Sequence, residues 1–199
     1  MDKPFSQACE NNKSPILDVL KEVFAQSKKV LEVGSGTGQH AVFFAPQLPH
    51  LQWHTSDLPD NHSGINHWID ECPSDNLYRP LLLDADMPKW NLEDIDGVFT
   101  ANTCHIMSWQ SVQNLFARVG KILQPGGRFC IYGPFNYNGQ YTSESNASFD
   151  VWLKEQAPHR AIRDFESINE LAEKRQMKLV DDYEMPANNR LLVFEKHSG

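Results

Sequence analysis

The segment of residues 30–38, VLEVGSGTG, restricts the possible folds more than any other part of the chain. An apolar run typical of a buried strand leads directly into Gly34, Gly36 and Gly38, and a helical segment follows. Glycines allow a tight turn and a close approach of the backbone to a ligand, and the first N–H groups of a helix attract an anionic group. The segment therefore predicts a strand, a ligand-binding loop and a helix, although a plain strand-to-helix turn has the same pattern.

Short apolar runs alternate with amphipathic segments along the rest of the chain, which predicts βαβ units and a mostly parallel sheet. The expected strands cover residues 29–33, 51–56, 80–83, 97–101, 128–132, 178–183 and 191–195. Only seven residues separate the last two, so these strands should pair antiparallel as a hairpin. We therefore expect an α/β fold with a doubly wound, seven-stranded sheet.

The helices and the longest loop are placed by local signals. Ser14 and Pro15 predict the start of the first helix, because serine is a good N-cap and proline suits the first helical position. Two later helices are expected over residues 149–156 and 166–176. Residues 133–148 are expected to form a long loop, and loops of this length often carry function.

Composition narrows the classes of partner. The chain has 199 residues, which fits one domain, and a net charge of −8 with no run of Lys and Arg. This disfavours bulk binding of nucleic acid, because neutralised phosphates supply much of that affinity. The four cysteines form no CxxC pair and the histidines have no HExxH spacing, so we expect neither a disulfide framework nor a metal site. Without an apolar leader or a membrane-length stretch, we expect a cytoplasmic protein that does not bind membranes.

Polar residues follow three of the other expected strands. Asp57 ends the second strand, and a carboxylate there can accept hydrogen bonds from both hydroxyls of a ribose. It could instead cap the next turn, since Pro59 follows. Asp84 follows the third strand, with Asp86 as a competitor, and Asn102 follows the fourth. Because the carboxyl ends of parallel strands share one edge, these residues should converge on one crevice.

Glu32 followed by G-x-G-x-G resembles motif I of the class I methyltransferases, which bind S-adenosylmethionine (SAM). Gln39 stands where the dinucleotide fingerprint has its third glycine, which counts against a nicotinamide-dependent oxidoreductase. The resemblance implies that the loop holds the methionine part and ribose of SAM, that Asp84 faces the adenine, and that Asn102 borders both cofactor and acceptor. The cofactor contacts predicted in this way are Glu32, Gly34, Ser35, Gly36, Gly38, Asp57, Leu58, Asp84, Ala85 and Asn102.

Four segments, one of which contains this motif, are similar to a narrower family, domain of unknown function 938, the methyltransferase-like protein 26 group. They are residues 12–17 (NKSPIL), 31–41 (LEVGSGTGQHA), 132–135 (YGPF) and 185–189 (MPANN). We expect the sheet order 3-2-1-4-5-7-6 with strand 7 antiparallel, and one domain over residues 1–199. Residues 1–27 should form a helical extension over the cofactor site, with Asn12 and Lys13 as part of a lid.

Candidates for the chemistry lie on the loops at the same edge. Transfer to an oxygen atom can need a base with a pKa near neutrality, and His105 is the best placed histidine, unless it is a structural one. Tyr137 is the second catalytic candidate. Contacts to the acceptor are expected from His40, Asn136, Tyr141, Asn188 and Asn189. His40 could instead pack against the SAM loop or face solvent, and the other four could anchor loops or form turns.

The sequence thus predicts a SAM-dependent methyltransferase with a small-molecule acceptor, and transfer to oxygen, nitrogen or sulfur stays open. A protein side chain is a possible acceptor. Two alternatives come from other classes. One is a SAM-binding scaffold that has lost turnover, because a fold does not fix function. The other, a nicotinamide-dependent oxidoreductase, is disfavoured by Gln39 and by the terminal hairpin.

Overall fold

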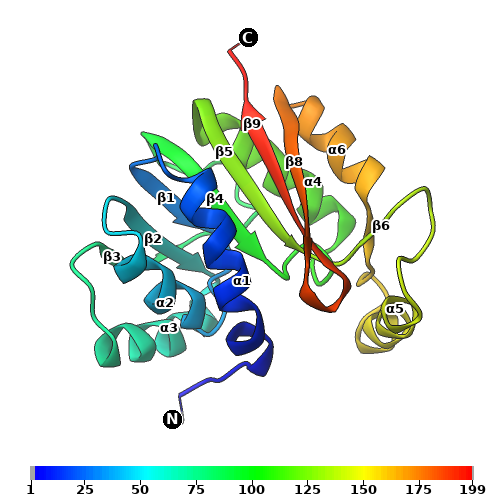
Figure 1. Cartoon of the computed structure of the whole chain (residues 1–199), viewed down its shortest axis with the longest axis horizontal. Helices are drawn as coiled ribbons and strands as arrows, with labels where there is room; N and C mark the ends of the chain where they lie inside the picture. Colours follow the sequence, from blue (N-terminus) through cyan, green and yellow to red (C-terminus); the bar gives the residue numbers. More distant parts are fainter. Residues whose placement is uncertain (1–2, 199) are drawn as a thin grey trace.

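The computed structural model describes residues 3–198 and contains a seven-stranded mixed sheet between two layers of helices (Figure 1). The strand order is β3-β2-β1-β4-β5-β9-β8, in which β9 runs antiparallel to both β5 and β8. The strands are β1 (Lys29–Glu32), β2 (Gln52–Asp57), β3 (Leu77–Leu82), β4 (Ile95–Ala101), β5 (Leu123–Gly133), β8 (Met177–Met185) and β9 (Asn189–Lys196). The fold class and the order 3-2-1-4-5-7-6 with an antiparallel last strand are confirmed.

The sheet is buried on both faces. In β1, Val30 belongs to the core on one face and Leu31 to the core on the other, and in β9 the same holds for Leu191 and Leu192. Successive side chains of a strand point to opposite faces, so near-continuous apolar runs are what a sheet covered on both sides requires.

Helices form the two outer layers. The helices α1 (Gln7–Val23), α2 (Gln39–Gln47) and α3 (Pro59–Glu71) cover one face, and α4 (Trp109–Ile122) and α6 (Phe165–Glu173) cover the other (Figure 1). The helix α5 (Glu144–Gln156) lies away from the sheet, near the turn of the β8–β9 hairpin, which contains the 3₁₀ helix η1 (Pro186–Asn188). Within residues 3–198, no helix has the length and apolarity needed to cross a bilayer.

The predicted start of the first helix is wrong. The helix α1 begins at Gln7, where Oγ of the N-cap Ser6 accepts a hydrogen bond from Cys9 N (3.3 Å), and Pro15 lies inside the helix. Proline removes one backbone donor from a helix interior. Contacts of the first two turns with α2, described below, hold the segment before Pro15 in helical form.

The expected loop over residues 133–148 is shorter than predicted. It contains β6 (Phe135–Asn136), which pairs with β7 (Arg163–Asp164), and α5 begins at Glu144. Similarly, β3 begins at Leu77 rather than at Pro80. Because β3 is an edge strand, a proline within it need not remove a hydrogen bond between strands.

Candidate active site

The glycine loop between β1 and α2 adopts a conformation that favours glycine. Gly34, Gly36 and Gly38 have φ angles of 72°, 59° and 93°. A Cβ atom at Gly34 would lie 2.7 Å from Cγ2 of Thr103, and one at Gly38 would lie 3.0 Å from Cα of Ile65. A Cβ atom at Gly36 would meet no atom of residues 3–198 within 4 Å. Close packing therefore requires glycine at the two outer positions, whereas the central position faces open space.

Buried polar contacts fix this loop to the ends of β1 and β2. Oε2 of Glu32 accepts hydrogen bonds from Ser35 Oγ (3.0 Å) and Trp53 Nε1 (3.1 Å). Ser35 N donates to Ser56 O (2.9 Å), and Ser56 N donates to Ser35 Oγ (3.1 Å). Burial raises the pKa of Glu32 to about 7, although the two hydrogen bonds oppose this shift. The loop is therefore held in place by groups of the protein itself.

Asp57 links the glycine loop to the start of α3. Its Oδ2 accepts a hydrogen bond from Gly36 N (2.7 Å), and its Oδ1 accepts from Leu58 N (2.7 Å) and Asn61 Nδ2 (2.9 Å). The bonds to Leu58 and Asn61 cap the next turn, as the alternative interpretation of Asp57 predicts. The bond to Gly36 is not part of that turn and ties Asp57 to the glycine loop. A carboxylate has about four acceptor sites, so three protein donors leave room for one more.

Of the two acidic residues after β3, Asp86 is bound to a helix. It accepts hydrogen bonds from Ser111 Oγ and Asn114 Nδ2 of α4, each at 2.8 Å. Asp84 Oδ1 accepts a hydrogen bond from the backbone N of Asp86 (2.8 Å), and Ala85 between them is buried. Asp84 is therefore the freer of the two carboxylates to meet an external ligand.

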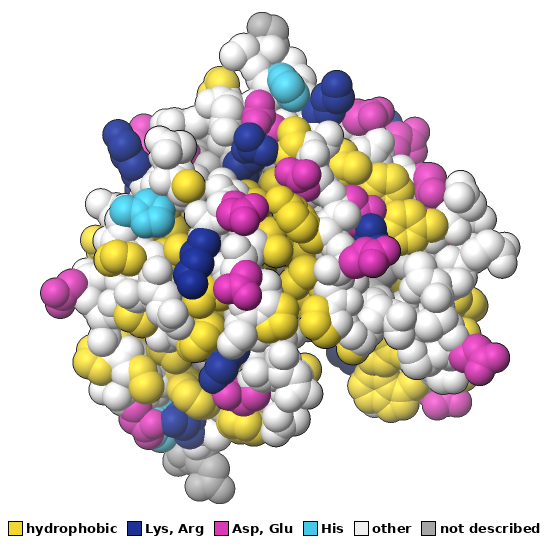
Figure 2. Space-filling model, in the orientation of Figure 1, with side chains coloured by type: hydrophobic (Ala, Val, Ile, Leu, Met, Phe, Trp, Pro, Cys, Tyr) yellow, Lys and Arg dark blue, Asp and Glu magenta, His cyan; other side chains and the backbone are white. Residues whose placement is uncertain are grey.

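A cavity of about 680 Å³ lies beside the glycine loop, between the first turns of α1, the end of β4 and α5. In Figure 2 the surface is hollowed at the lower edge of the view, between the body of the sheet and the lobe around α5. The volume falls within the range of about 300–1,000 Å³ that is usual for small-molecule sites. The predicted site residues that line this cavity are Gly34, Ser35, Gly36, His40, Asn102, His105 and Asn189. The predicted cofactor contacts that do not line it are Glu32, Gly38, Asp57, Leu58, Asp84 and Ala85.

Asn102 opens the loop after β4. Its φ angle of 57° lies in the left-handed region, which asparagine tolerates better than most residues. Its backbone N donates to Tyr132 O (2.9 Å), which ties the loop to β5. Both residues line the cavity.

His105 is buried in the cavity wall, with 7% of its surface exposed. Its ring lies edge-on to that of Phe149, with 5.4 Å between the ring centroids, and its carbonyl accepts a hydrogen bond from Ala161 N (3.1 Å). Burial, followed by the positive charges of Arg163 and Arg160, lowers the pKa of His105 to about 4. The ring is therefore neutral at physiological pH, and its pKa lies below the near-neutral value expected for a general base.

His40 joins two walls of the cavity. Its Nε2 lies 2.6 Å from Oδ1 of Asn12 on α1, and its ring stacks on Phe44 with 5.1 Å between the centroids. Burial lowers the pKa of His40 to about 4, so the neutral ring donates from Nε2 to the Asn12 oxygen. His40 thus fastens α1 to α2.

Gln39 also fastens α1 to α2, through contacts that lie nearer the start of α1 than that of His40. Its Oε1 accepts a hydrogen bond from Ser6 N (2.6 Å), and its Nε2 donates to Ser6 O (3.3 Å) and Glu10 Oε1 (2.9 Å). Glu10 also pairs with Lys13. The residue that departs from the dinucleotide fingerprint therefore holds the start of α1 beside the glycine loop. That residues 1–27 cover a bound cofactor stays a prediction.

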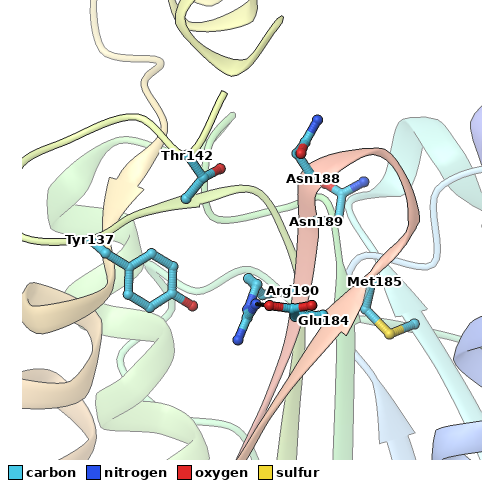
Figure 3. A pocket seen from close by; sticks show the side chains of 7 residues that line it. All are labelled: Tyr137, Thr142, Glu184, Met185, Asn188, Asn189 and Arg190. Atoms are coloured by element: carbon cyan, nitrogen blue, oxygen red, sulfur yellow. Dashed lines mark ion pairs between the residues drawn. The ribbon is translucent and has the colours of Figure 1, made fainter. Parts of the chain in front are cut away.

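Tyr137 and Asn188 line a second cavity of about 430 Å³ beside the β8–β9 hairpin (Figure 3). The Tyr137 hydroxyl points toward Arg190 and donates to Asp182 Oδ2 (2.8 Å), while Arg190 pairs with both Asp182 and Glu184. Burial and the hydrogen bond to Asp182 raise the pKa of Tyr137. Tyr137 therefore lies apart from His105, and its proton is held by a carboxylate.

Two predicted acceptor contacts line neither cavity. Asn136 lies in β6, and Tyr141 is 44% exposed and donates from its hydroxyl to Asp150 Oδ2 (2.6 Å). Asn189 borders both cavities. The structure thus brings His40, His105 and Asn189 together, and it places Asn136, Tyr137 and Tyr141 elsewhere.

Several cavity residues carried no signal in the sequence. Cys9, Asn146, Phe149, Trp152 and Arg160 line the cavity with the glycine loop. They lie in the first turns of α1, in α5 and in the segment after α5, none of which follows a strand of the main sheet. The position of α1 brings Cys9 to the site, and the position of α5 brings the other four.

The family comparison covers nearly the whole chain. Residues 3–196 match the model of a family described as protein of unknown function (DUF938). This confirms the narrower resemblance found in the sequence.

Individual relatives are more distant. The malonyl-[acyl-carrier protein] O-methyltransferase of Alcanivorax borkumensis is 27% identical over 104 residues, which are 52% of this chain and 34% of that protein. An O-methyltransferase family 2 protein from Planctomyces limnophilus, in complex with apigenin, has a TM-score of 0.84 at 16% identity over 95% of this chain and 57% of that one. The S-adenosylmethionine-dependent methyltransferase SibL, in its apo form, has a TM-score of 0.81 at 19% identity, covering 96% and 56% of the two chains.

The chain spans about a third of the length of the curated relative and little more than half of these structures. At such low identities the structural likeness shows the fold alone. The chain belongs to the family described as protein of unknown function (DUF938), and it has the fold of the class I SAM-dependent methyltransferases.

Proposed function

We propose that this chain is a SAM-dependent methyltransferase that transfers a methyl group to an oxygen atom of a small-molecule acceptor. The observation that carries the proposal is the glycine loop, whose central Gly36 faces open space at a cavity of about 680 Å³ on the carboxyl edge of the sheet. The names of the relatives support it, because they include O-methyltransferases and one complex with a small aromatic compound.

The residues present fit this cofactor. Asp57 has an acceptor site left for a ribose hydroxyl, and the space at Gly36 leaves room for the methionine part beside the loop. Asp84 and Ala85 follow the neighbouring β3 and would meet the adenine. When bound, SAM supplies a methyl group on a sulfonium sulfur, which is already strongly electrophilic.

The remaining work of the protein is to position the acceptor, exclude water and take up a proton. Asp57 and the glycine loop would hold SAM, which would supply its methyl group to the acceptor oxygen and keep the electron pair of the broken C–S bond on sulfur. We assign the hydroxyl proton to His105, since its ring is neutral and lines the cavity. Tyr137 faces the other cavity, so we give it no part in this step.

The proposal is tested by titrating the protein calorimetrically with SAM, S-adenosylhomocysteine and NADH. We expect micromolar binding of the first two and none of NADH. Binding of NADH alone would favour an oxidoreductase. Binding of SAM without methyl transfer to any member of a hydroxylated acceptor panel, followed with labelled SAM, would favour a scaffold.

The role of His105 is tested separately once an acceptor is found. We expect His105→Ala to lower kcat about a hundredfold or more, a usual size for general base catalysis, with little change in SAM affinity. The control is His67→Ala, because His67 lies on α3 beside Glu71 and lines neither cavity. Equal kcat values for the two variants would exclude His105 as the base.

A further inference from the structure

The cavity beside the glycine loop differs in charge from the rest of the molecule. The chain has 26 acidic and 18 basic residues, yet no aspartate or glutamate of residues 3–198 lines this cavity. Its lining contains one permanently charged group, the guanidinium of Arg160. The two histidines of the lining, His40 and His105, are neutral, because burial lowers the pKa of each to about 4.

Arg160 has no carboxylate partner among the residues that the structure describes. None of the ion pairs formed within residues 3–198 includes it, and its Nε is buried without a hydrogen-bond partner from this part of the chain. Buried donors are nearly always satisfied, so an unsatisfied one calls for an explanation. A ligand group that accepts hydrogen bonds is such an explanation.

The neighbouring Arg163 shows what a structural arginine looks like in this region. Its Nε donates to Cys104 O (3.1 Å), and its Nη2 donates to Met107 O (2.6 Å) and His159 O (2.9 Å). Arg163 therefore joins the loop after β4 to the segment after α5. Arg160 makes none of these structural hydrogen bonds, and it lines the cavity.

The backbone around Arg160 places it next to the candidate base. Arg160 N donates to Ala157 O (3.0 Å), and the next residue, Ala161, donates from its N to His105 O (3.1 Å). The guanidinium and the His105 ring are thus carried by segments that are hydrogen-bonded to each other. A ligand bound by one would be presented to the other.

Aromatic side chains form the wall on this side. Phe149 and Trp152 of α5 line the cavity, and their rings stack with 5.7 Å between the centroids at an interplanar angle of 15°. Phe149 also contacts the His105 ring. Such a wall suits a flat ring, whose faces gain from aromatic contacts.

We propose that the methyl acceptor is an aromatic hydroxyl compound with a carboxylate or similar anionic group, which Arg160 binds while Phe149 and Trp152 contact the ring. The inference rests on the proposed function, since it names the substrate class of the same site. A guanidinium suits this role because its planar fork matches the geometry of a carboxylate.

A bound anionic group would also change the pKa of the candidate base, His105. The positive charges of Arg163 and Arg160 both lower the pKa of His105. An anionic group bound at Arg160 would offset part of this effect and raise the pKa of His105 toward neutral pH, where a general base is most effective. The correct acceptor would thereby activate the residue that takes its proton.

The test uses a matched pair of probes, protocatechuate and its neutral carboxamide, which differ only in the anionic group. Their affinities are measured calorimetrically with and without S-adenosylhomocysteine, for the wild type and the variants Arg160→Met, Arg160→Lys and Arg118→Met. Arg118 is the control, because its Nε is also buried without a partner among residues 3–198, but it lines neither cavity. Thermal unfolding checks that each variant is folded.

We expect the wild type and Arg118→Met to bind the carboxylate about tenfold or more tightly than the amide, as a hydrogen bond to a charged group implies. Arg160→Met should abolish this preference, and Arg160→Lys should keep part of it. Equal affinity for the two probes in the wild type, binding of neither probe, or a preference that survives Arg160→Met would overturn the inference. Failure to bind S-adenosylhomocysteine would instead overturn the proposed function. The affinities of the two probes measured without S-adenosylhomocysteine would still decide whether Arg160 binds the anion.

Discussion

At the scale of single residues, Gly36 is the position where a small change should affect binding more than folding. We expect Gly36→Ala to weaken SAM binding roughly five- to 150-fold, since a methyl group would enter space that the ligand needs. The left-handed backbone should also cost about 1–2 kcal/mol of the free energy of unfolding. Calorimetry and urea unfolding measure the two effects.

Gly126→Ala is the matched control for this prediction. Gly126 also has a positive φ angle, 82°, and a Cβ atom there would likewise meet nothing within 4 Å among the described residues. It lies at the start of β5, outside both cavities described here. The two variants should lose similar stability, and an equal loss of SAM affinity in both would contradict a ligand beside Gly36.

Glu32 should make stability depend on pH in an unusual direction. Its pKa in the folded protein is raised from 4.5 to about 7, so the folded state holds a proton that the unfolded state has lost. This contribution to stability is complete below pH 4.5 and is lost as pH rises through 7. The free energy of unfolding of Glu32→Gln, relative to that of the wild type, should therefore increase between pH 5 and 8 by about 3 kcal/mol.

The comparison between the two proteins isolates Glu32. His40, His54 and His105 have lowered pKa values and change stability in the opposite direction, but they do so equally in the wild type and the variant. A Gln oxygen can accept the bonds from Ser35 and Trp53 that Oε2 accepts now. A difference in stability that does not change with pH would show that Glu32 is not protonated in the folded protein.

The residues of the site could be predicted from the sequence where they directly follow a parallel strand, because such strands end at the same edge of the sheet. The glycine loop, Asn102 and His105 follow β1 and β4 and do line the cavity. Arg160 and Phe149 could not be predicted, because they reach the site through α5, whose path across the edge depends on contacts such as the bond from Ile162 N to Asp150 Oδ1 (2.8 Å). Tyr137 was in the right segment, but its hydroxyl is bound to Asp182, which no local pattern indicates.

At the scale of elements, the side chain of Gln39 should control how firmly α1 lies on the site. We expect Gln39→Ala to speed hydrogen exchange in residues 3–14, to reduce the free energy of unfolding by about 1–3 kcal/mol and to weaken SAM binding, because hydrogen bonds to Ser6 and Glu10 are lost. Mass spectrometry of peptic fragments measures the exchange.

Gln7→Ala tests whether any change at the start of α1 would do the same. Gln7 makes an exposed bond to Asn11 within the helix, which is worth only about 0.2–0.5 kcal/mol. Exchange in residues 3–14 should therefore stay close to that of the wild type. If Gln39→Ala left exchange unchanged as well, α1 would be held by its apolar contacts and by the hydrogen bond between His40 and Asn12 rather than by Gln39.

Element boundaries were predictable only where local signals had no competitor. Ser14 followed by Pro15 is a good start signal, but Ser6 caps α1 two turns earlier and side chains of α2 hold those turns. The segment 133–148 has no apolar period, so β6 and the first turn of α5 were missed. Ser143, whose Oγ accepts a hydrogen bond from Asn146 N (3.0 Å), is the cap signal that could have placed α5.

At the scale of the whole molecule, cofactor binding should be visible as thermal stabilisation. A ligand at a hundredfold excess over its Kd adds about 2.7 kcal/mol to the free energy of unfolding, if it binds the folded state alone. For a chain of this size we expect S-adenosylhomocysteine to raise Tm by roughly 5–10 °C. NADH at the same concentration is the control, and equal shifts with both compounds would contradict a specific SAM site.

The strand order was predictable from the resemblance to the class I methyltransferases, and rules that act on the whole chain support parts of it. Alternating strands and helices imply right-handed parallel units, and seven residues between the last two strands allow only a hairpin. The two cores then follow, since every central strand must bury both faces. No rule of this kind places α5, which packs outside the sheet.

The last strand in the described chain, β9, lies inside the sheet rather than at its edge. While the protein is being synthesised, β5 therefore keeps an unpaired apolar edge until Lys196 has left the ribosome, and β8 has no place in the sheet before then. Unpaired edges of this kind attract other chains, so the nascent protein depends on protection until that moment. The insertion of β9 also brings Asn189 to the cavity, so a nascent chain in which β9 has not yet emerged has no finished site.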